Sequence, residues 1–242
     1  IGVRLVGSEM CIRDRTPTDW IPTDEGLGSP LQLWLQNNVL VTVNRWSDSS
    51  NKENHAIQES EVNQPVGINN GGLEFDQSGT DKQYLDLTSS IAVGTGGAFS
   101  LFFAARLDDL ANETILSDSN SEFIEILRDN QFRFKGNVPG AKTSVLKTDA
   151  TPFTTSPMIV SLIRPTNGEL EWYVDGVLVE LNASTTNGTN TAGFDFQNIG
   201  SRNDNDRFLD GTIMELLFYK EYITGSTLTR MHTYLKEKFN IS

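Results

Sequence analysis

Short runs in which apolar and polar residues alternate, separated by turn residues, fill most of this chain. Such alternation is typical of β-strands with one face in a core and the other in solvent. Asp175-Gly176 stands between two of these runs, where a type I′ hairpin turn is expected. About a dozen short strands at this spacing predict an all-β sandwich or jelly roll. The strands are expected at 31–35, 98–105, 113–117, 122–128, 131–135, 158–164, 169–174, 177–181, 194–199 and 211–219, with a strand, a turn at Gly79 and a second strand within 73–87.

Helical periodicity occurs only near the C-terminus. Leu228, Met231 and Leu235 recur at intervals of three and four, which is the apolar stripe of an amphipathic helix. Ser226 is a suitable N-cap for a helix over 226–239. We therefore expect a two-sheet antiparallel sandwich whose C-terminal amphipathic helix covers one end.

The chain of 242 residues is short enough for one sandwich domain, which we place at 31–242. Residues 1–15 carry several arginines in an otherwise acidic chain, and their end resembles a translated sequencing adaptor. We interpret this segment as an assembly artefact or a disordered arm. It contains Cys11, the single cysteine, so no disulfide can form within the chain. Residues 16–30 are expected to be a linker rich in Pro, Gly and Asp.

The formal net charge of −13 restricts the partners. Nucleic acid is not expected, because phosphate contacts need clustered Lys and Arg. Membrane insertion is not expected either, since no apolar run approaches the roughly 18–20 residues that cross a bilayer. An acidic chain is compatible with cation binding.

Several segments together resemble bacterial and viral laminin G-like, concanavalin A-like domains. The segments are Leu31 to Leu35, Trp46 with the polar residues after it, 72–76, 172–176 and 208–219. The resemblance covers roughly residues 31–241. It implies a lectin-like jelly roll of two curved antiparallel sheets. Domains of this kind commonly bind glycans or proteins, often with calcium, and serve as modules of adhesins, enzymes and phage fibres.

Glycosidases and polysaccharide lyases share this fold, but the catalytic pattern is incomplete here. Glucanases of the fold read Glu-x-Asp-x-x-Glu, whereas 74–79 places Gly79 at the second Glu. Glu169 and Glu171 would share one strand face, where we expect a solvated surface. His232 is expected on the helix surface rather than as a base. We therefore expect a non-catalytic protein.

Sugar recognition needs flat aromatic faces together with forked polar groups. Trp46 and Tyr173 are the aromatic candidates, and Trp172 on the same strand is expected in the core. The polar loop that follows the strand 194–199 could supply hydroxyl ligands. Its candidate ligands are Arg202, Asn203, Asp204 and Asp206.

Calcium prefers six to eight oxygen ligands. The resemblance implies a structural calcium near a sheet edge, with Glu215 and Asp76 as its ligands in this chain. Gln36 stands where related domains often have Asp.

Taken together, these residues predict a lectin-like module that recognises glycans at a cell or virion surface, and the resemblance adds Ca²⁺ as its candidate cofactor. The alternatives are a structural virion component that contacts other subunits, and a polysaccharide-degrading enzyme of the same fold. An extracellular or virion-surface location is expected.

Overall fold

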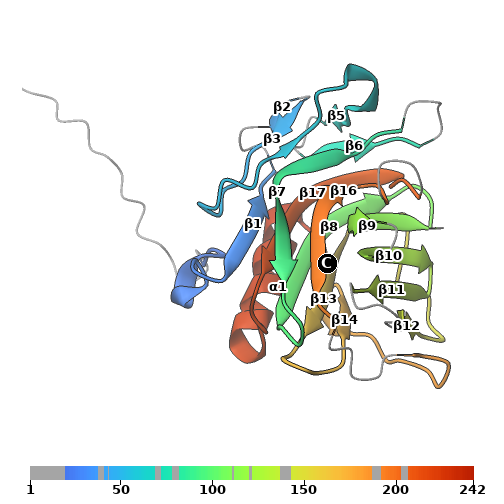
Figure 1. Ribbon diagram of the computed structural model, residues 1–242. Helices are drawn as coiled ribbons and strands as arrows, with labels where there is room; N and C mark the ends of the chain where they lie inside the picture. The colour runs from blue at the N-terminus through green and yellow to red at the C-terminus, as the bar shows by residue number, and fades with distance from the viewer. Residues whose placement is uncertain are drawn as a thin grey trace, which may run out of the picture.

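The computed structural model describes residues 20–37, 41–42, 44–68, 72–77, 82–110, 112–119, 122–136, 143–186, 192–202 and 207–242. Two antiparallel sheets face one another as a sandwich, and one helix, α1 (Gly225–Phe239), lies outside it (Figure 1). The predicted two-sheet antiparallel sandwich with a C-terminal helix is confirmed. Two short 3-10 helices, η1 (Asp24–Gly26) and η2 (Glu61–Asn63), accompany the strands.

The first sheet has eight strands. Their order is β15 (Val177–Leu178), β14 (Glu171–Val174), β13 (Met158–Arg164), β8 (Phe99–Leu107), β17 (Gly211–Tyr219), β6 (Leu73–Phe75) and β5 (Val66–Gly67), with β1 (Leu31–Leu35) also paired to β17.

The second sheet has nine strands. Their order is β12 (Ser144–Lys147), β11 (Gln131–Lys135), β10 (Glu122–Arg128), β9 (Glu113–Ser119), β16 (Phe194–Ile199), β7 (Leu85–Val93), β4 (Ala56–Ile57), β3 (Arg45–Trp46) and β2 (Val41–Thr42).

The main core fills the space between the two sheets and is rich in aromatic rings. Phe99 of the first sheet lies 5.6 Å from Phe134 of the second, and 5.7 Å from Phe218 of its own sheet, between ring centroids. Trp172 is fully buried and stacks on Phe153 at 5.0 Å. The prediction that Trp172 belongs to the core is confirmed.

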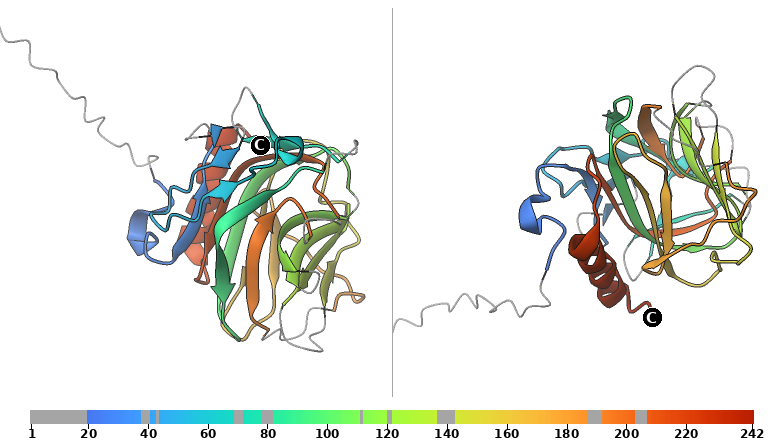
Figure 2. Two further views of the ribbon diagram at one scale, coloured as in Figure 1. Left: turned by 45° about the horizontal axis from the view of Figure 1, so that its top comes forward. Right: turned by 90° about the horizontal axis from the view of Figure 1, so that it is seen from below.

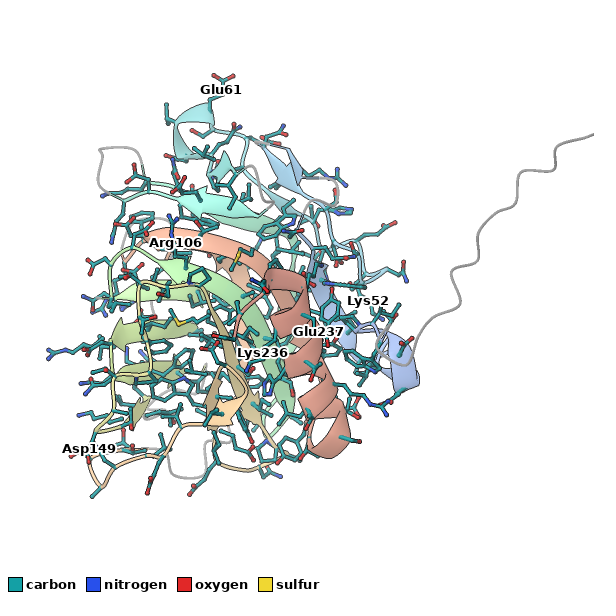
Figure 3. The ribbon with its side chains drawn as sticks, turned by 180° about the vertical axis from the view of Figure 1, so that it is seen from behind. Lys52, Glu61, Arg106, Asp149, Lys236 and Glu237 are labelled. Carbon is teal, nitrogen blue, oxygen red and sulfur yellow. The ribbon has the colours of Figure 1, made fainter. Side chains whose placement is uncertain are left out.

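The helix α1 lies along the outer face of the eight-stranded sheet (Figures 2 and 3). A second apolar cluster packs between the helix and this face. Leu228, Met231 and Leu235 of the helix are buried against this face. Because one face of β8 joins the main core and the other joins this cluster, β8 is apolar along almost its whole length. The helix therefore covers a sheet face, and the expectation that it covers one end of the sandwich was wrong.

The segment expected to be a linker is packed where it is described. Trp20 lies edge-on to Tyr234 of α1, with ring centroids 6.2 Å apart. The hydroxyl of Tyr219 donates to the carbonyl of Pro22 at 3.0 Å, and Leu27 is buried. Residues 20–30 thus belong to the folded domain, since they complete the second apolar cluster.

Most predicted strands are confirmed, several to the residue, and one local expectation was wrong. The two strands expected within 73–87 are present and enter different sheets, because β6 pairs with β17 while β7 pairs with β16 and β4. The turn expected at Gly79 lies outside the described residues. The helix begins at Gly225 after an extended Thr224, without a side-chain cap, so Ser226 is not its N-cap. The predicted turn at Asp175-Gly176 is confirmed by positive φ angles of 48° and 75°.

Candidate ligand-binding site

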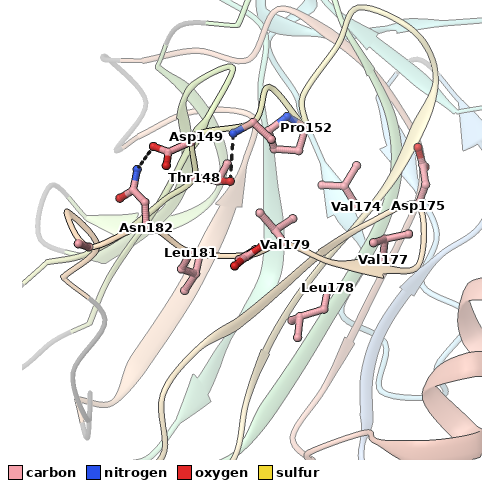
Figure 4. A pocket seen from close by; sticks show the side chains of 13 residues that line it. Thr148, Asp149, Pro152, Val174, Asp175, Val177, Leu178, Val179, Leu181 and Asn182 are labelled. Atoms are coloured by element: carbon pink, nitrogen blue, oxygen red, sulfur yellow. Dashed lines mark hydrogen bonds between the residues drawn. The ribbon is translucent and has the colours of Figure 1, made fainter.

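A pocket of about 730 Å³ opens at one edge of the sandwich (Figure 4). The loop after β12, from Thr148 to Pro152, forms one side of it. The β14–β15 hairpin and the segment that follows it form the other side. Since β12 and β15 are the last strands of their sheets, the pocket lies where the two layers separate. We call it the rim pocket. Its lining residues are Thr148, Asp149, Ala150, Pro152, Val174, Asp175, Val177, Leu178, Val179, Glu180, Leu181, Asn182 and Ala183.

A hydrogen-bonded pair of polar side chains joins the two sides of the rim pocket. The amide Nδ2 of Asn182 donates to Oδ1 of Asp149 at 2.8 Å (Figure 4). The main-chain N–H of Asn182 donates to the carbonyl of Lys147, also at 2.8 Å. Oγ1 of Thr148 accepts from the N–H of Ala150 at 3.2 Å. These contacts hold an amide and a carboxylate in place before any ligand arrives.

The hairpin supplies an apolar wall beside this pair. Val177 and Leu178 are 68% and 56% exposed, which is unusual for large aliphatic side chains in this protein. The turn that presents them is held by Asp175, whose N–H donates to the carbonyl of Ile159 and whose Oδ1 accepts from the N–H of Ile159, both at 2.8 Å. The wall is therefore part of a braced hairpin.

An apolar wall beside fixed carboxylate and amide groups suits a sugar ring. The C–H face of a sugar packs on apolar surface, and its hydroxyls pair with forked donors and acceptors. Asp149, Glu180 and Asn182 provide such groups in the rim pocket.

Arg202, a predicted ligand residue, lies on the outer face of the nine-stranded sheet. Its Nη1 is 3.5 Å from Oε1 of Glu125, a fully buried carboxylate. Arg133 and Arg207 contact the same carboxylate, so three guanidinium groups converge on one negative charge. The other predicted ligands of this loop, Asn203, Asp204 and Asp206, lie outside the described residues.

The structure does not bring the two predicted aromatic ligands together with Arg202. Trp46 is fully buried in the main core, and its Nε1 donates to the carbonyl of Gln36 at 2.7 Å. Its ring therefore has no face open to a ligand, which corrects that expectation. Tyr173 lies under α1 on the other sheet, 5.5 Å from the ring of His232, and donates to Glu171 at 2.7 Å.

The predicted calcium ligands do not form one site. Phe75 pairs with Gly211, so Asp76 lies near the start of β17, whereas Glu215 is four residues further along that strand. At about 3.4 Å per residue this separation is about 14 Å, too far for one ion. Glu215 is fully buried and bound to protein groups. Among the described residues, no three His, Cys, Asp or Glu side chains are grouped to hold a metal.

Two arrangements have the residue types of a catalytic site. Burial raises the pKa of Glu113 to about 9, and Asp109, Asp210 and Asp108 add to the rise. This carboxyl is fully buried and accepts from the N–H of Asp210 at 2.5 Å. A Ser–His pair also exists, with Ser161 Oγ 2.9 Å from Nε2 of His232.

Neither arrangement is open to a substrate. Ser161 on β13 is fully buried and His232 on α1 is 6% exposed, because the helix face that carries His232 packs against the sheet over Ser161. Burial, with a smaller effect of Lys236, lowers the pKa of His232 to about 4. The expected surface position of His232 was wrong, since its ring packs on Phe102 and Tyr173.

A family model described as the concanavalin A-like lectin/glucanases superfamily matches residues 77–228, more than half of the chain. The chain belongs to the concanavalin A-like lectin/glucanase superfamily. The matched region includes the rim pocket and the arginines around Glu125. The superfamily contains both binding domains and enzymes, so membership alone does not decide the activity. No curated protein matches the chain.

Solved structures similar to this superfamily member include toxin binding domains. One is a structure of botulinum neurotoxin type C, a toxin whose cell entry depends on interaction with two ganglioside molecules. It has 18% identity and a TM-score of 0.58, and the match covers 86% of this chain and 52% of that one. The botulinum neurotoxin DC binding domain in complex with rat synaptotagmin II has 17% identity and a TM-score of 0.59, covering 86% and 52%.

The binding domain of Paraclostridial Mosquitocidal Protein 1 has 13% identity and a TM-score of 0.58, covering 85% of this chain and 52% of that one. The chain thus spans about half the length of these structures. At this identity the likeness extends to the fold alone.

Sequence reasoning missed both the rim pocket and the arginine cluster. The exposed pair Val177 and Leu178 directly follows the recognised Asp-Gly turn, which is a usable signal for the pocket wall. Asp149 and Asn182 are 33 residues apart in sequence, and only the tertiary fold brings them together. In the described part of the chain, no helix is both long enough and apolar enough to span a membrane.

Proposed function

We propose that this protein is a non-catalytic carbohydrate-binding module and that the rim pocket holds the glycan. The observation that carries the proposal is the pairing of Asp149 and Asn182 beside the exposed wall of Val177 and Leu178. Such a site binds sugar through apolar contact and through hydroxyl pairing at once. A pocket of about 730 Å³ is within the range of small-ligand sites.

The described carboxylates support binding rather than hydrolysis. A retaining glycosidase needs two carboxyl groups about 5–5.5 Å apart and open to the sugar. Glu125 is paired with three arginines, and Glu113 is closed off from solvent. Of the three carboxylates that line the rim pocket, Asp175 is engaged by the main-chain N–H of Ile159 and Asp149 by Asn182, which leaves Glu180 alone where a glycosidase needs two.

We place the protein at a cell surface or another extracellular surface, where glycans are displayed. Toxins whose binding domains share this fold interact with gangliosides, sialylT and synaptotagmin. These interactions belong to the toxins. For this chain they make surface glycans the first ligands to test.

A broad glycan array with the full chain tests the proposal. We expect selective binding to a small set of structurally related glycans, retained in Asp108→Ala, an exposed carboxylate outside the pocket. The same binding should be lost in the double variant Asp149→Ala, Asn182→Ala. An array with no selective binding by the wild type would contradict the carbohydrate-binding function. Selective binding that the double variant retains would contradict only the rim pocket as its site.

A further inference from the structure

The charged side chains that line the rim pocket all have the same sign. Of the thirteen lining residues, three are carboxylates and none is Lys, Arg or His. Asp149 lies on the loop after β12 and Asp175 in the turn between β14 and β15, on opposite sides of the pocket (Figure 4). Glu180 follows β15 and is exposed. A ligand in the rim pocket therefore has carboxylates on both sides of it.

These three carboxylates form no ion pairs within the described part of the chain. Buried carboxylates elsewhere in the protein do, since Glu125 contacts Arg133 and Glu215 contacts Lys238. No Lys or Arg of the described residues is paired with a carboxylate of the rim pocket. The formal net charge of −13, which counts every residue, adds a general attraction for cations.

The hydrogen-bonding capacity of the rim pocket also favours a ligand that is rich in donors. Oδ1 of Asp149 accepts from Asn182, and Oδ1 of Asp175 accepts from the N–H of Ile159. The second oxygen of each aspartate and both oxygens of Glu180 accept no hydrogen bond from the described residues. An ionised carboxylate cannot donate, so the ligand must supply the donors.

A protonated amine satisfies both conditions. An ammonium group has three donors and no acceptor, and its hydrogen bonds to carboxylates are roughly twice as strong as neutral ones. A sugar hydroxyl or an acetamide N–H brings one donor and no charge. A uronate, sialic acid or sulfated sugar brings further acceptors and a like charge, which the carboxylates repel.

We propose that the rim pocket is specific for glycans built of hexosamine units whose amino groups are free and protonated. The ammonium group lies against the carboxylates, while the C–H face of the ring packs on Val177 and Leu178. The apolar wall stays necessary, because a charged side chain there keeps its water and does not pack on C–H groups. This inference rests on the proposed function, since it names the glycan class of the same pocket.

Isothermal titration of the full chain at pH 6 with four ligands tests the proposal. They are a glucosamine tetramer, the same tetramer fully N-acetylated, a galacturonic acid tetramer and tetralysine. An amine of ordinary basicity is protonated at this pH. We expect the amine tetramer to bind at least about tenfold more tightly than each of the other three, and its preference to fall as salt is added.

Two substitutions assign the preference to the rim pocket. Asp149→Asn and Glu180→Gln each remove one charge at nearly constant size, and the Asn side chain can still accept from Asn182. The double variant should bind the amine and N-acetylated tetramers within about twofold of one another. Asp108→Asn and Glu59→Gln, at exposed carboxylates outside the pocket, should keep the tenfold preference. The preference is a ratio measured on one protein, so a smaller folded fraction does not change it.

Three outcomes would overturn the inference. An N-acetylated tetramer that binds as tightly as the amine would exclude amine specificity and leave the rim pocket as the glycan site. Equal binding of tetralysine, or an equal loss of preference in the control variants, would show attraction by net charge alone. Binding of none of the sugar tetramers would exclude this glycan class, while the glycan array decides separately whether the protein binds carbohydrate.

Discussion

The indole Nε1 of Trp34 donates a 2.7 Å hydrogen bond to Oε1 of Glu215, across 181 residues of sequence. The same oxygen accepts from the hydroxyl of Tyr234 at 2.8 Å, and Nζ of Lys238 lies 2.5 Å from Oε2. One buried carboxylate therefore ties β1, β17 and α1 together over the second apolar cluster. These contacts explain why a residue expected to bind calcium has a structural role instead.

Removing the cation beside Glu215 should destabilise the fold. Lys238→Ala leaves a fully buried carboxylate without its ion pair, so we expect a loss of about 2 kcal/mol in the free energy of unfolding. Lys220→Ala, an exposed lysine at the end of β17, should change it by less than about 0.5 kcal/mol. Urea denaturation followed by tryptophan fluorescence measures both. If both variants changed the free energy of unfolding equally, the ion pair between Lys238 and Glu215 would make no specific contribution to stability.

His232 should make the protein sensitive to acid. Its pKa is lowered to about 4 in the fold from an ordinary value of 6.5, by burial and by Lys236. The neutral ring is the folded form, so its contribution to stability is complete above pH 6.5 and is lost as the pH falls through 4. His232→Gln should therefore lose about 2 kcal/mol less than the wild type between pH 7 and pH 4. NMR titration of the imidazole checks the pKa, and a value near 6.5 would contradict the buried position.

Glu113 should have the opposite pH dependence. Its pKa is raised to about 9, mainly by burial, so the carboxyl is protonated in the fold at neutral pH. Its contribution is complete below pH 4.5 and is lost as the pH rises through 9. Glu113→Gln imitates the protonated acid, so we expect it to be more stable than the wild type by about 1–3 kcal/mol at pH 8 and nearly equal at pH 4. Glu59→Gln, an exposed control, should match the wild type at both values. A Glu113→Gln curve parallel to that of the wild type would refute the raised pKa.

Arg164 should be essential for stability although it takes no part in binding. It is fully buried, donates to the carbonyl of Gly97 at 2.7 Å and to that of Ala192 at 2.7 Å, and lies over Phe99 at 4.8 Å. Arg164→Met keeps the length but leaves two carbonyls without this donor, so we expect a loss of about 3 kcal/mol. Arg128→Met, an exposed change on β10, is the control in the same denaturation experiment. A loss no larger than in the control would contradict the role of Arg164.

The fold could be predicted from the sequence because its signals are local. Short alternating or continuously apolar runs bounded by turn residues predict β10, β11, β13, β16 and β17 to the residue, and Asp175-Gly176 predicts the turn between β14 and β15. Which strands pair with one another depends on contacts between distant segments, so the local pattern does not predict it. The segment 73–87 contains two strands as expected, but their assignment to different sheets depends on contacts with β17 and β16.

The binding residues could be predicted only in part, for the same reason. Trp46 is an aromatic residue in a polar segment, where a sugar ligand is expected, yet its ring is buried in the core. Arg202 was identified from a polar loop, whereas its partners Arg133 and Glu125 come from two other strands. Asp149 and Asn182 have no distinguishing pattern at all, since ordinary polar turns have the same composition.

Isothermal titration of the best array glycan into the wild type, Asn182→Ala and Leu178→Asp tests the central claim most directly. Asn182 provides the amide of the rim pocket and Leu178 its exposed apolar wall. We predict that each variant binds at least about tenfold more weakly while its melting temperature stays close to that of the wild type. Wild-type affinity in both variants would contradict the claim that the rim pocket is the glycan site of this protein.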